Sequence, residues 1–298
     1  MNLKYLIILP FICLLVSCKT PETPLVYRPY ESLLAVIADL EFYLNYDIYR
    51  FPAPKDISDQ NIFRASLVRL ANFEKINPGE FKEETALSQA RSWLILCEYD
   101  LSSDKYVECI KIKGKLESLA RKEWEVLESF REILKKTDNF TTLEEYIKQK
   151  KIEIEKIRDF GEKHKGSRFE TLSLIESENA QVEMIEFIKM NRLMLKNPIK
   201  IIEAEYQNLL SENKESVRYY EHLINFADFY ASSADEYVRL HPPERGDFVI
   251  EIFREYILKA IGLYSEVEKT DGIPERSIGK AKLESLNQFS RTIEMKAK

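Results

Sequence analysis

Residues 219–240 read YYEHLINFADFYASSADEYVRL, a stretch with the periodicity of an amphipathic helix. An α-helix turns once every 3.6 residues, so side chains three and four positions apart lie on one face. The loop at 241–246, HPPERG, carries two prolines and a glycine, which end a helix. We therefore predict a helix from about Asn213 to Leu240. Its apolar face is formed by Tyr219, Leu223, Phe226, Tyr230, Ala234 and Tyr237.

The same spacing recurs along most of the chain and predicts an all-α fold of about ten helices. Only 8 of the 298 residues are glycine and 32% are charged, a composition that favours helices with charged outer faces. No alternating apolar–polar run is long enough to predict a strand. The predicted helices cover about 32–50, 58–76, 81–101, 104–136, 141–164, 168–195, a short segment from 198, 213–240, 247–269 and a last segment from about 275.

Short links between these helices predict antiparallel hairpins of neighbouring helices. The two long helices near the middle are strongly charged and have narrow apolar stripes. Such stripes are typical of coiled-coil-like hairpin arms rather than of core helices.

Residues 93–109 carry the pattern of one helical repeat. Their spacing resembles that of a tetratricopeptide repeat, a helical hairpin of about 34 residues. The closing proline of that motif is absent, with Arg121 near its place. The resemblance implies a TPR-like solenoid of stacked hairpins, and the alternative is hairpins that match by chance. The large and small positions of the motif are filled by Trp93, Leu96, Cys97, Tyr106 and Cys109.

The first residues have the features of a signal that targets a chain to a membrane. Lys4 precedes an apolar run of about a dozen residues, which is the length of a signal peptide and too short to cross a bilayer. The run ends in Leu15-Val16-Ser17-Cys18, which resembles the lipobox of bacterial lipoproteins. The resemblance implies cleavage between Ser17 and Cys18 and lipidation of Cys18. The alternative is an ordinary secretory signal followed by a chance cysteine.

This resemblance divides the chain into a signal peptide (1–17), a tether (18–30) with three prolines, and a helical body (31–298). It also implies a bacterial cell-envelope location with contact to the membrane through the N-terminal lipid. Lys19 follows the lipidated cysteine where an Asp would retain the protein at the inner membrane of enteric bacteria. We therefore expect the outer membrane.

Two further cysteines belong to the body. Cys97 and Cys109 each lie six residues from Ser103, the centre of a predicted turn. In an antiparallel hairpin they would face each other, and the compartment beyond the inner membrane permits disulfides. We predict that their thiols are able to bond, and the alternative is two small buried apolar side chains without a bond.

Motifs for chemistry are missing from the sequence. The histidines do not follow the spacing of known metal sites, no Gly-rich phosphate loop occurs, and we expect no metal, no cofactor and no enzyme activity. We interpret Glu162-Lys163-His164 and Glu221-His222 as solvated helix surface. The formal net charge of −6 argues against a nucleic-acid partner.

Two interpretations of the aromatic face at 219–237 stay open. Its apolar spacing favours packing in the core, whereas tyrosines with polar tips also suit a binding groove. The groove would be lined by Tyr219, Leu223, Phe226, Tyr230 and Tyr237. A second aromatic set closes the first predicted helix, and we expect it to be core: Phe42, Tyr43, Tyr46, Tyr49 and Phe51.

These observations lead to one functional expectation with two alternatives. We expect a lipid-anchored helical adaptor that binds another envelope protein or a peptide. The first alternative is a ligand-binding helical lipoprotein associated with a transporter. The second is a surface-exposed lipoprotein that contacts a host. A closed cavity at Tyr219, Phe226 and Tyr230 would favour the ligand-binding protein, and a solid core there the adaptor.

Overall fold

The computed structural model describes residues 29–135 and 140–297. The predicted signal peptide (1–17), the cleavage site with Ser17 and Cys18, and most of the predicted tether lie outside the described residues. The tether was expected to extend to residue 30, whereas the first described helix begins at Pro29.

Within the described ranges the chain forms eleven α-helices, one short 3-10 helix and no strand, which confirms the all-α prediction. A single isolated bridge joins Lys55 and Asn61. The α-helices are α2 (Pro29–Tyr43), α3 (Ile62–Ile76), α4 (Lys82–Ile95), α5 (Tyr99–Ile112), α6 (Glu117–Leu134), α7 (Leu143–Lys163), α8 (Arg168–Met190), α9 (Pro198–Glu212), α10 (Tyr219–Leu240), α11 (Ile250–Lys269) and α12 (Arg276–Lys296); the 3-10 helix is η2 (Arg192–Met194).

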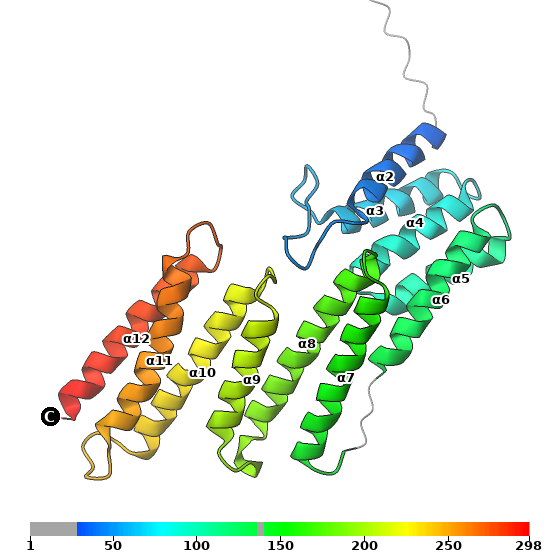
Figure 1. Ribbon diagram of the computed structural model, residues 1–298. Coiled ribbons are helices and arrows are strands. Elements are labelled where there is room, and N and C mark those ends of the chain that lie inside the picture. The colour runs from blue at the N-terminus through cyan, green and yellow to red at the C-terminus, as the bar shows by residue number, and fades with distance from the viewer. Residues whose placement is uncertain (1–28, 136–139, 298) are drawn as a thin grey trace, which may run out of the picture.

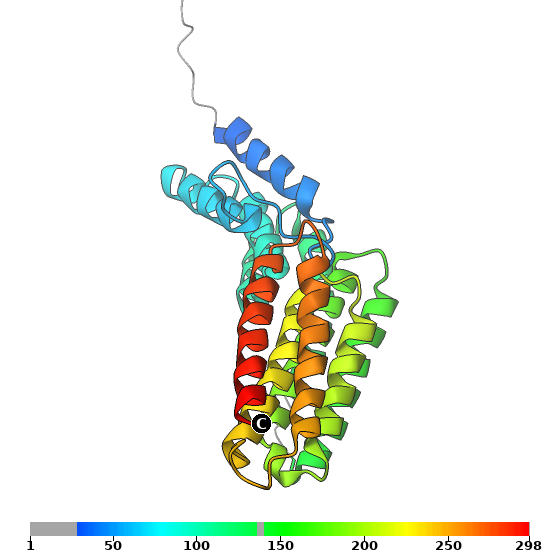
Figure 2. The same cartoon turned by 90° about the vertical axis from the view of Figure 1, so that its left-hand side faces the viewer.

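Every helix packs against the next one along the chain, and α2 also contacts α4. The helices therefore stand in a row in sequence order, from α2 at one end of the molecule to α12 at the other (Figure 1). Turned by 90°, the row is seen end on, with α2 and α3 inclined to the rest (Figure 2). This is the stacked, solenoid-like arrangement that the hairpin pattern predicted.

One predicted turn is misplaced, and this explains the extra helix. The chain turns at Leu96–Glu98 and again after Lys113, instead of at 102–104. Ser102 lies inside α5 and is buried, and its hydroxyl donates to the carbonyl of Ala90 on α4 at 2.8 Å. Of the two serines that suggested a turn, Ser102 thus joins α5 to α4, and Ser103 joins α5 to α6 through Glu128. Gly114 marks the break that was missed: a Cβ there would lie 2.2 Å from the Glu83 carboxylate.

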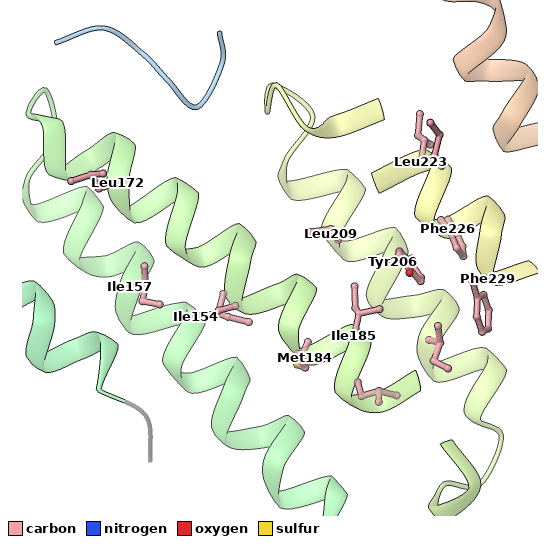
Figure 3. Packing of buried hydrophobic residues seen from close by; sticks show 14 of the residues in the cluster. Ile154, Ile157, Leu172, Met184, Ile185, Tyr206, Leu209, Leu223, Phe226 and Phe229 are labelled. Atoms are coloured by element: carbon pink, nitrogen blue, oxygen red, sulfur yellow. The ribbon is translucent and has the colours of Figure 1, made fainter. Parts of the chain in front are cut away.

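A continuous apolar core runs through the row from α4 to α12. Figure 3 shows its middle part, where side chains of α9 such as Tyr206 and Leu209 lie between those of α8 and α10. Two smaller clusters hold α2 and α3 against the start of the row, around Leu40 and Leu33. Each stacked helix therefore closes the core of its predecessor, as in repeat proteins.

The long central helices belong to this core and do not project as arms. Ile154, Ile157 and Phe160 of α7 are buried, and so are Leu172 and Ile185 of α8. The apolar stripes of α7 and α8 are narrow, but neighbouring helices pack against them along their length. None of the helices described in 29–135 and 140–297 is both long and apolar enough to span a bilayer.

Candidate functional site

The aromatic face of α10 lies inside the core, so of the two open interpretations the binding groove is the wrong one. Leu223, Phe226 and Tyr230 are at most 4% exposed. The ring of Phe226 stacks on Tyr206 of α9 with centroids 4.7 Å apart, and it makes a tilted contact with the ring of Tyr230 at 4.8 Å. Tyr219 is only half-buried but packs against the same core. The core interpretation that the spacing also allowed is the one the structure has.

The polar tips of these tyrosines make fixed contacts. The Tyr230 hydroxyl donates to Glu203 Oε1 of α9 at 2.8 Å, and Lys259 of α11 donates to the same oxygen at 2.7 Å. The Tyr237 hydroxyl accepts the backbone N–H of Val249 at 2.8 Å, just before α11 begins. These tyrosines join α9, α10 and α11 and offer no groove to a partner.

A cleft does open elsewhere, between α7 and α9, with α8 as its floor. Its volume is about 400 Å³. Ile154 and Met184 form the apolar floor, while the walls are charged. We call it the α7–α9 cleft, and its lining is Lys151, Ile154, Glu155, Arg158 and Asp159 of α7, Gln181 and Met184 of α8, and Glu205, Asn208 and Glu212 of α9.

Two ion pairs cross this cleft. Lys151 Nζ lies 2.6 Å from Glu205 Oε1, and Arg158 Nη2 lies 2.6 Å from Glu212 Oε2. Burial by itself raises the pKa of Glu212, but the hydrogen bonds and charges of Arg158, with help from Gln181 and Lys151, outweigh it and lower that pKa. Glu212 is therefore charged at neutral pH. The pairs join α7 to α9 across the cleft, above the floor that α8 forms.

A chain of hydrogen bonds leads from the cleft to the N-terminal part. Gln181 donates to Glu212 and accepts from Asn213 Nδ2 at 2.7 Å. Asn213 Oδ1 in turn accepts the hydroxyl of Tyr49 at 2.9 Å. The Tyr49 carbonyl also accepts the N–H of Val217 at 2.8 Å. The segment that follows α2 therefore lies across the loop between α9 and α10, although the two are distant in the sequence.

We call this segment, residues 44–51, the strap. A pocket of about 200 Å³ lies between the strap and the start of α8 and includes Asp47, Arg50 and Arg168 in its lining. Within the second predicted aromatic set, Tyr49 is buried as expected. Phe42, Phe51 and Tyr46 are 79%, 54% and 36% exposed, so the core prediction is wrong for these three. Phe42 lies at the end of α2, whereas Phe51 lies in the strap, where its ring packs against that of Tyr46 with centroids 6.2 Å apart.

A buried pair of a histidine and a glutamate lies between α8 and α10, where the sequence pattern does not reveal it. His222 of α10 and Glu178 of α8 are each 1% exposed, and His222 Nε2 lies 2.5 Å from Glu178 Oε1. Ser216 Oγ donates to the same carboxylate oxygen at 2.7 Å. His222 was interpreted as solvated surface, which is wrong. The apolar neighbours Leu223 and Phe226 on its face were the sign of burial.

This arrangement differs from a catalytic triad. In a triad the histidine accepts the serine proton, whereas here Ser216 and His222 both bond to Glu178. The three side chains are buried between helices, where a substrate has no access. Among the described residues no group of three or more His, Cys, Asp or Glu side chains is placed to hold a metal ion.

The two body cysteines are free, and the predicted disulfide is wrong. Cys97 lies in the turn between α4 and α5, and Cys109 lies near the far end of α5. Twelve residues of nearly helical chain separate their α-carbons by about 18 Å, beyond the reach of a disulfide. Burial raises the pKa of the Cys97 thiol to about 12 and that of Cys109 to about 11.

Comparison with known proteins adds no relative. The chain matches no protein-family model, no curated protein and no solved structure. The site described above therefore stands on its own geometry.

Proposed function

We propose that this chain is a bacterial cell-envelope lipoprotein, anchored at Cys18, that acts as a helical adaptor and binds a segment of another envelope protein. The observation that carries the proposal is the α7–α9 cleft in the middle of a row of stacked helices. Stacked hairpins build extended surfaces that bind peptides and proteins. The lipid would raise the effective concentration of this surface for partners at the same membrane.

The lining of the cleft suggests the chemistry of the partner segment. It holds two cationic side chains, Lys151 and Arg158, and four anionic ones, which gives a net charge of −2. Of the anionic side chains, Glu155 and Asp159 are exposed, while Glu205 and Glu212 pair with the cations across the cleft. A segment with a lysine or arginine and an apolar side chain for Ile154 and Met184 would suit it.

The alternative of a transporter-associated ligand-binding protein depended on a closed cavity at Tyr219, Phe226 and Tyr230. These positions are core, so that alternative has no support from this face. We assign the protein no catalytic activity, no cofactor, and no nucleic-acid partner.

The anchor is tested by mass spectrometry of the protein extracted from membranes. We expect a mature chain that begins at Cys18 and carries a diacylglycerol on its thiol. A Cys18→Ser variant should remain uncleaved. An unmodified Cys18 thiol in the mature protein would show that the lipoprotein assignment is wrong.

The adaptor role is tested by site-specific photo-crosslinking in intact cells. A benzoylphenylalanine in place of Asn208, inside the cleft, should crosslink to one defined envelope protein. The matched control is the same probe in place of Ala281, an exposed position on α12. Glu155→Lys should weaken the Asn208 crosslink, whereas Glu284→Lys on α12 should not. Equal crosslinking from both probe positions would contradict a cleft-specific partner.

A further inference from the structure

The turn between α8 and α9 has a composition unlike the rest of the chain. Between Glu186 and Glu203 the sequence carries four cationic residues and no acidic one, although the whole chain has a net charge of −6. The same stretch is rich in large apolar residues. Its cations are Lys189, Arg192, Lys196 and Lys200.

Three apolar side chains of this turn face solvent. Leu193 is 93% exposed, and Met190 and Met194 are each 75% exposed. Their neighbours Leu195 and Ile199 are partly buried and pack against the main core. Other residues of the turn therefore pack on the core. Burial in the fold does not explain why Met190, Leu193 and Met194 are apolar. We call residues 190–198 the tip loop.

The tip loop has a defined local structure. The N–H groups of Met194 and Leu195 donate to the carbonyls of Asn191 and Arg192 at 3.0 and 3.1 Å, which forms η2. Arg192 also pairs with Glu236 of α10 at 2.7 Å. The loop is therefore held in place and presents its apolar side chains outward in a fixed arrangement.

The position of the loop in the body is also informative. In both views the turn between α8 and α9 lies at the opposite end of the molecule from α2, which follows the predicted tether (Figures 1 and 2). Helices α10 and α12 finish at this same end, where Leu240 and Met295 are 63% and 68% exposed. Exposed apolar side chains are therefore also present at other helix ends on this side of the molecule.

We propose that the tip loop is a membrane-contacting element that inserts into the interface of an anionic phospholipid bilayer. Leu193, Met190 and Met194 would enter the boundary between headgroups and acyl chains, as the apolar side of interfacial segments does. Lys196 and Lys200, both exposed, would contact lipid phosphates, whereas Lys189 and Arg192 have carboxylate partners.

Charge decides between a lipid surface and a protein as the occupant. The stretch between Glu186 and Glu203 is positive on an otherwise acidic protein, and it combines that charge with freely exposed Leu and Met. Attraction to anionic headgroups plus burial of apolar side chains is the combination that binds segments to membranes. This contact between the tip loop and the bilayer does not depend on the proposed partner of the cleft. It would attach the helical body to the membrane at the end that is far from the lipid anchor.

The test uses the full, lipidated chain reconstituted in vesicles. Leu193→Cys is labelled with an environment-sensitive nitrobenzoxadiazole dye, since burial and a raised pKa protect Cys97 and Cys109 from labelling at neutral pH. In phosphatidylglycerol-containing vesicles we expect a shift of emission to shorter wavelength and quenching by doxyl-labelled acyl chains. A label at Leu258→Cys, an exposed apolar position in the middle of α11, should show neither.

Charge variants complete the design. Lys196→Glu with Lys200→Glu should abolish the quenching at position 193, and phosphatidylcholine vesicles should give the same loss. Lys163→Glu with Lys165→Glu makes the same charge change near the other end of α8 and should leave the quenching intact.

Two results would overturn the proposal. One is an unquenched label at position 193 in anionic vesicles. The other is a spectral shift that arises only with added envelope proteins and without lipid quenching, which would identify a protein interface instead. The Asn208 crosslink should persist in the Lys196→Glu, Lys200→Glu variant, so that failure of either proposal is recognised separately.

Discussion

His222 Nε2 on α10 lies 2.5 Å from Glu178 Oε1 on α8, and both side chains are buried. The two residues are 44 positions apart, with α9 between them in the chain. The same carboxylate accepts the hydroxyl of Ser216 from the α9–α10 loop. Glu178 on α8 therefore holds both the α9–α10 loop and α10, next to the contacts that Tyr49 of the strap makes.

Removal of this carboxylate should destabilise the protein strongly. Glu178→Ala leaves the buried groups of His222 and Ser216 without their acceptor, and we expect a loss of about 2–4 kcal/mol in the free energy of unfolding. Urea denaturation followed by circular dichroism measures it. Glu284→Ala, on the exposed face of α12, should change stability by less than about 0.5 kcal/mol. Equal effects of the two changes would show that the buried pair contributes nothing.

The acid sensitivity of the N-terminal hairpins should depend on Glu123 of α6. Arg91 of α4 donates to its two oxygens at 3.0 and 2.6 Å, and Tyr106 of α5 donates at 2.7 Å. Burial raises the pKa of Glu123, but the Arg91 hydrogen bonds, the charges of Arg168 and Arg91, and the Tyr106 hydrogen bond outweigh it. The pKa therefore falls below its usual 4.5.

A carboxylate with a lowered pKa stabilises the fold above its unfolded-state pKa, and this contribution is lost as the pH falls through the folded-state value. Glu123→Gln should therefore lower the free energy of unfolding by about 2–3 kcal/mol at neutral pH. The difference from the wild type should shrink below about pH 4.5. Denaturation curves across this pH range test it, and a difference that stays constant with pH would contradict the role of the charge.

Glycine has opposite roles at two helical positions. A Cβ on Gly161 of α7 would lie 2.8 Å from Ser173 Cβ on α8, too close for two carbon atoms. Gly262 of α11 has open space around it. Gly262→Ala should stabilise the protein by about 0.5–1 kcal/mol through helix propensity. Gly161→Ala should destabilise it by about 1–3 kcal/mol because α7 and α8 must separate. Thermal unfolding distinguishes them, and a gain in stability from both would show that the close approach is absent.

The free thiols give a chemical test of the hairpin. With their pKa values raised to about 12 and 11 by burial, Cys97 and Cys109 should hardly react with iodoacetamide at pH 8 in the native protein. Both should react quickly in urea without prior reduction, because no disulfide joins them. Mass spectrometry counts the alkylated cysteines. Protection that persists in urea until a reductant is added would indicate a bond.

The sequence by itself determined the fold class and most of the helix positions. Apolar residues three and four apart, with prolines and glycines at the ends, are local signals. They place α11 and α12 within a few residues of their observed bounds, and they place the end of α10 at Leu240 but its start six residues too early. The stacking of neighbours follows from short links alone. The main error was the turn predicted at Ser102-Ser103-Asp104, because serines that suit a turn also fit between packed helices.

Only the tertiary structure decided which apolar and polar side chains become buried. Periodicity puts Phe226 and Tyr230 on one face but does not say whether a neighbour covers it, and α9 and α11 do. The burial of His222 depends on Glu178, which is remote in sequence, so no local pattern reveals it. The α7–α9 cleft likewise exists because three separate helices meet at a particular spacing. These are non-local relationships, whereas the helical pattern is local, and this is why the sequence specified the elements and the structure specified the sites.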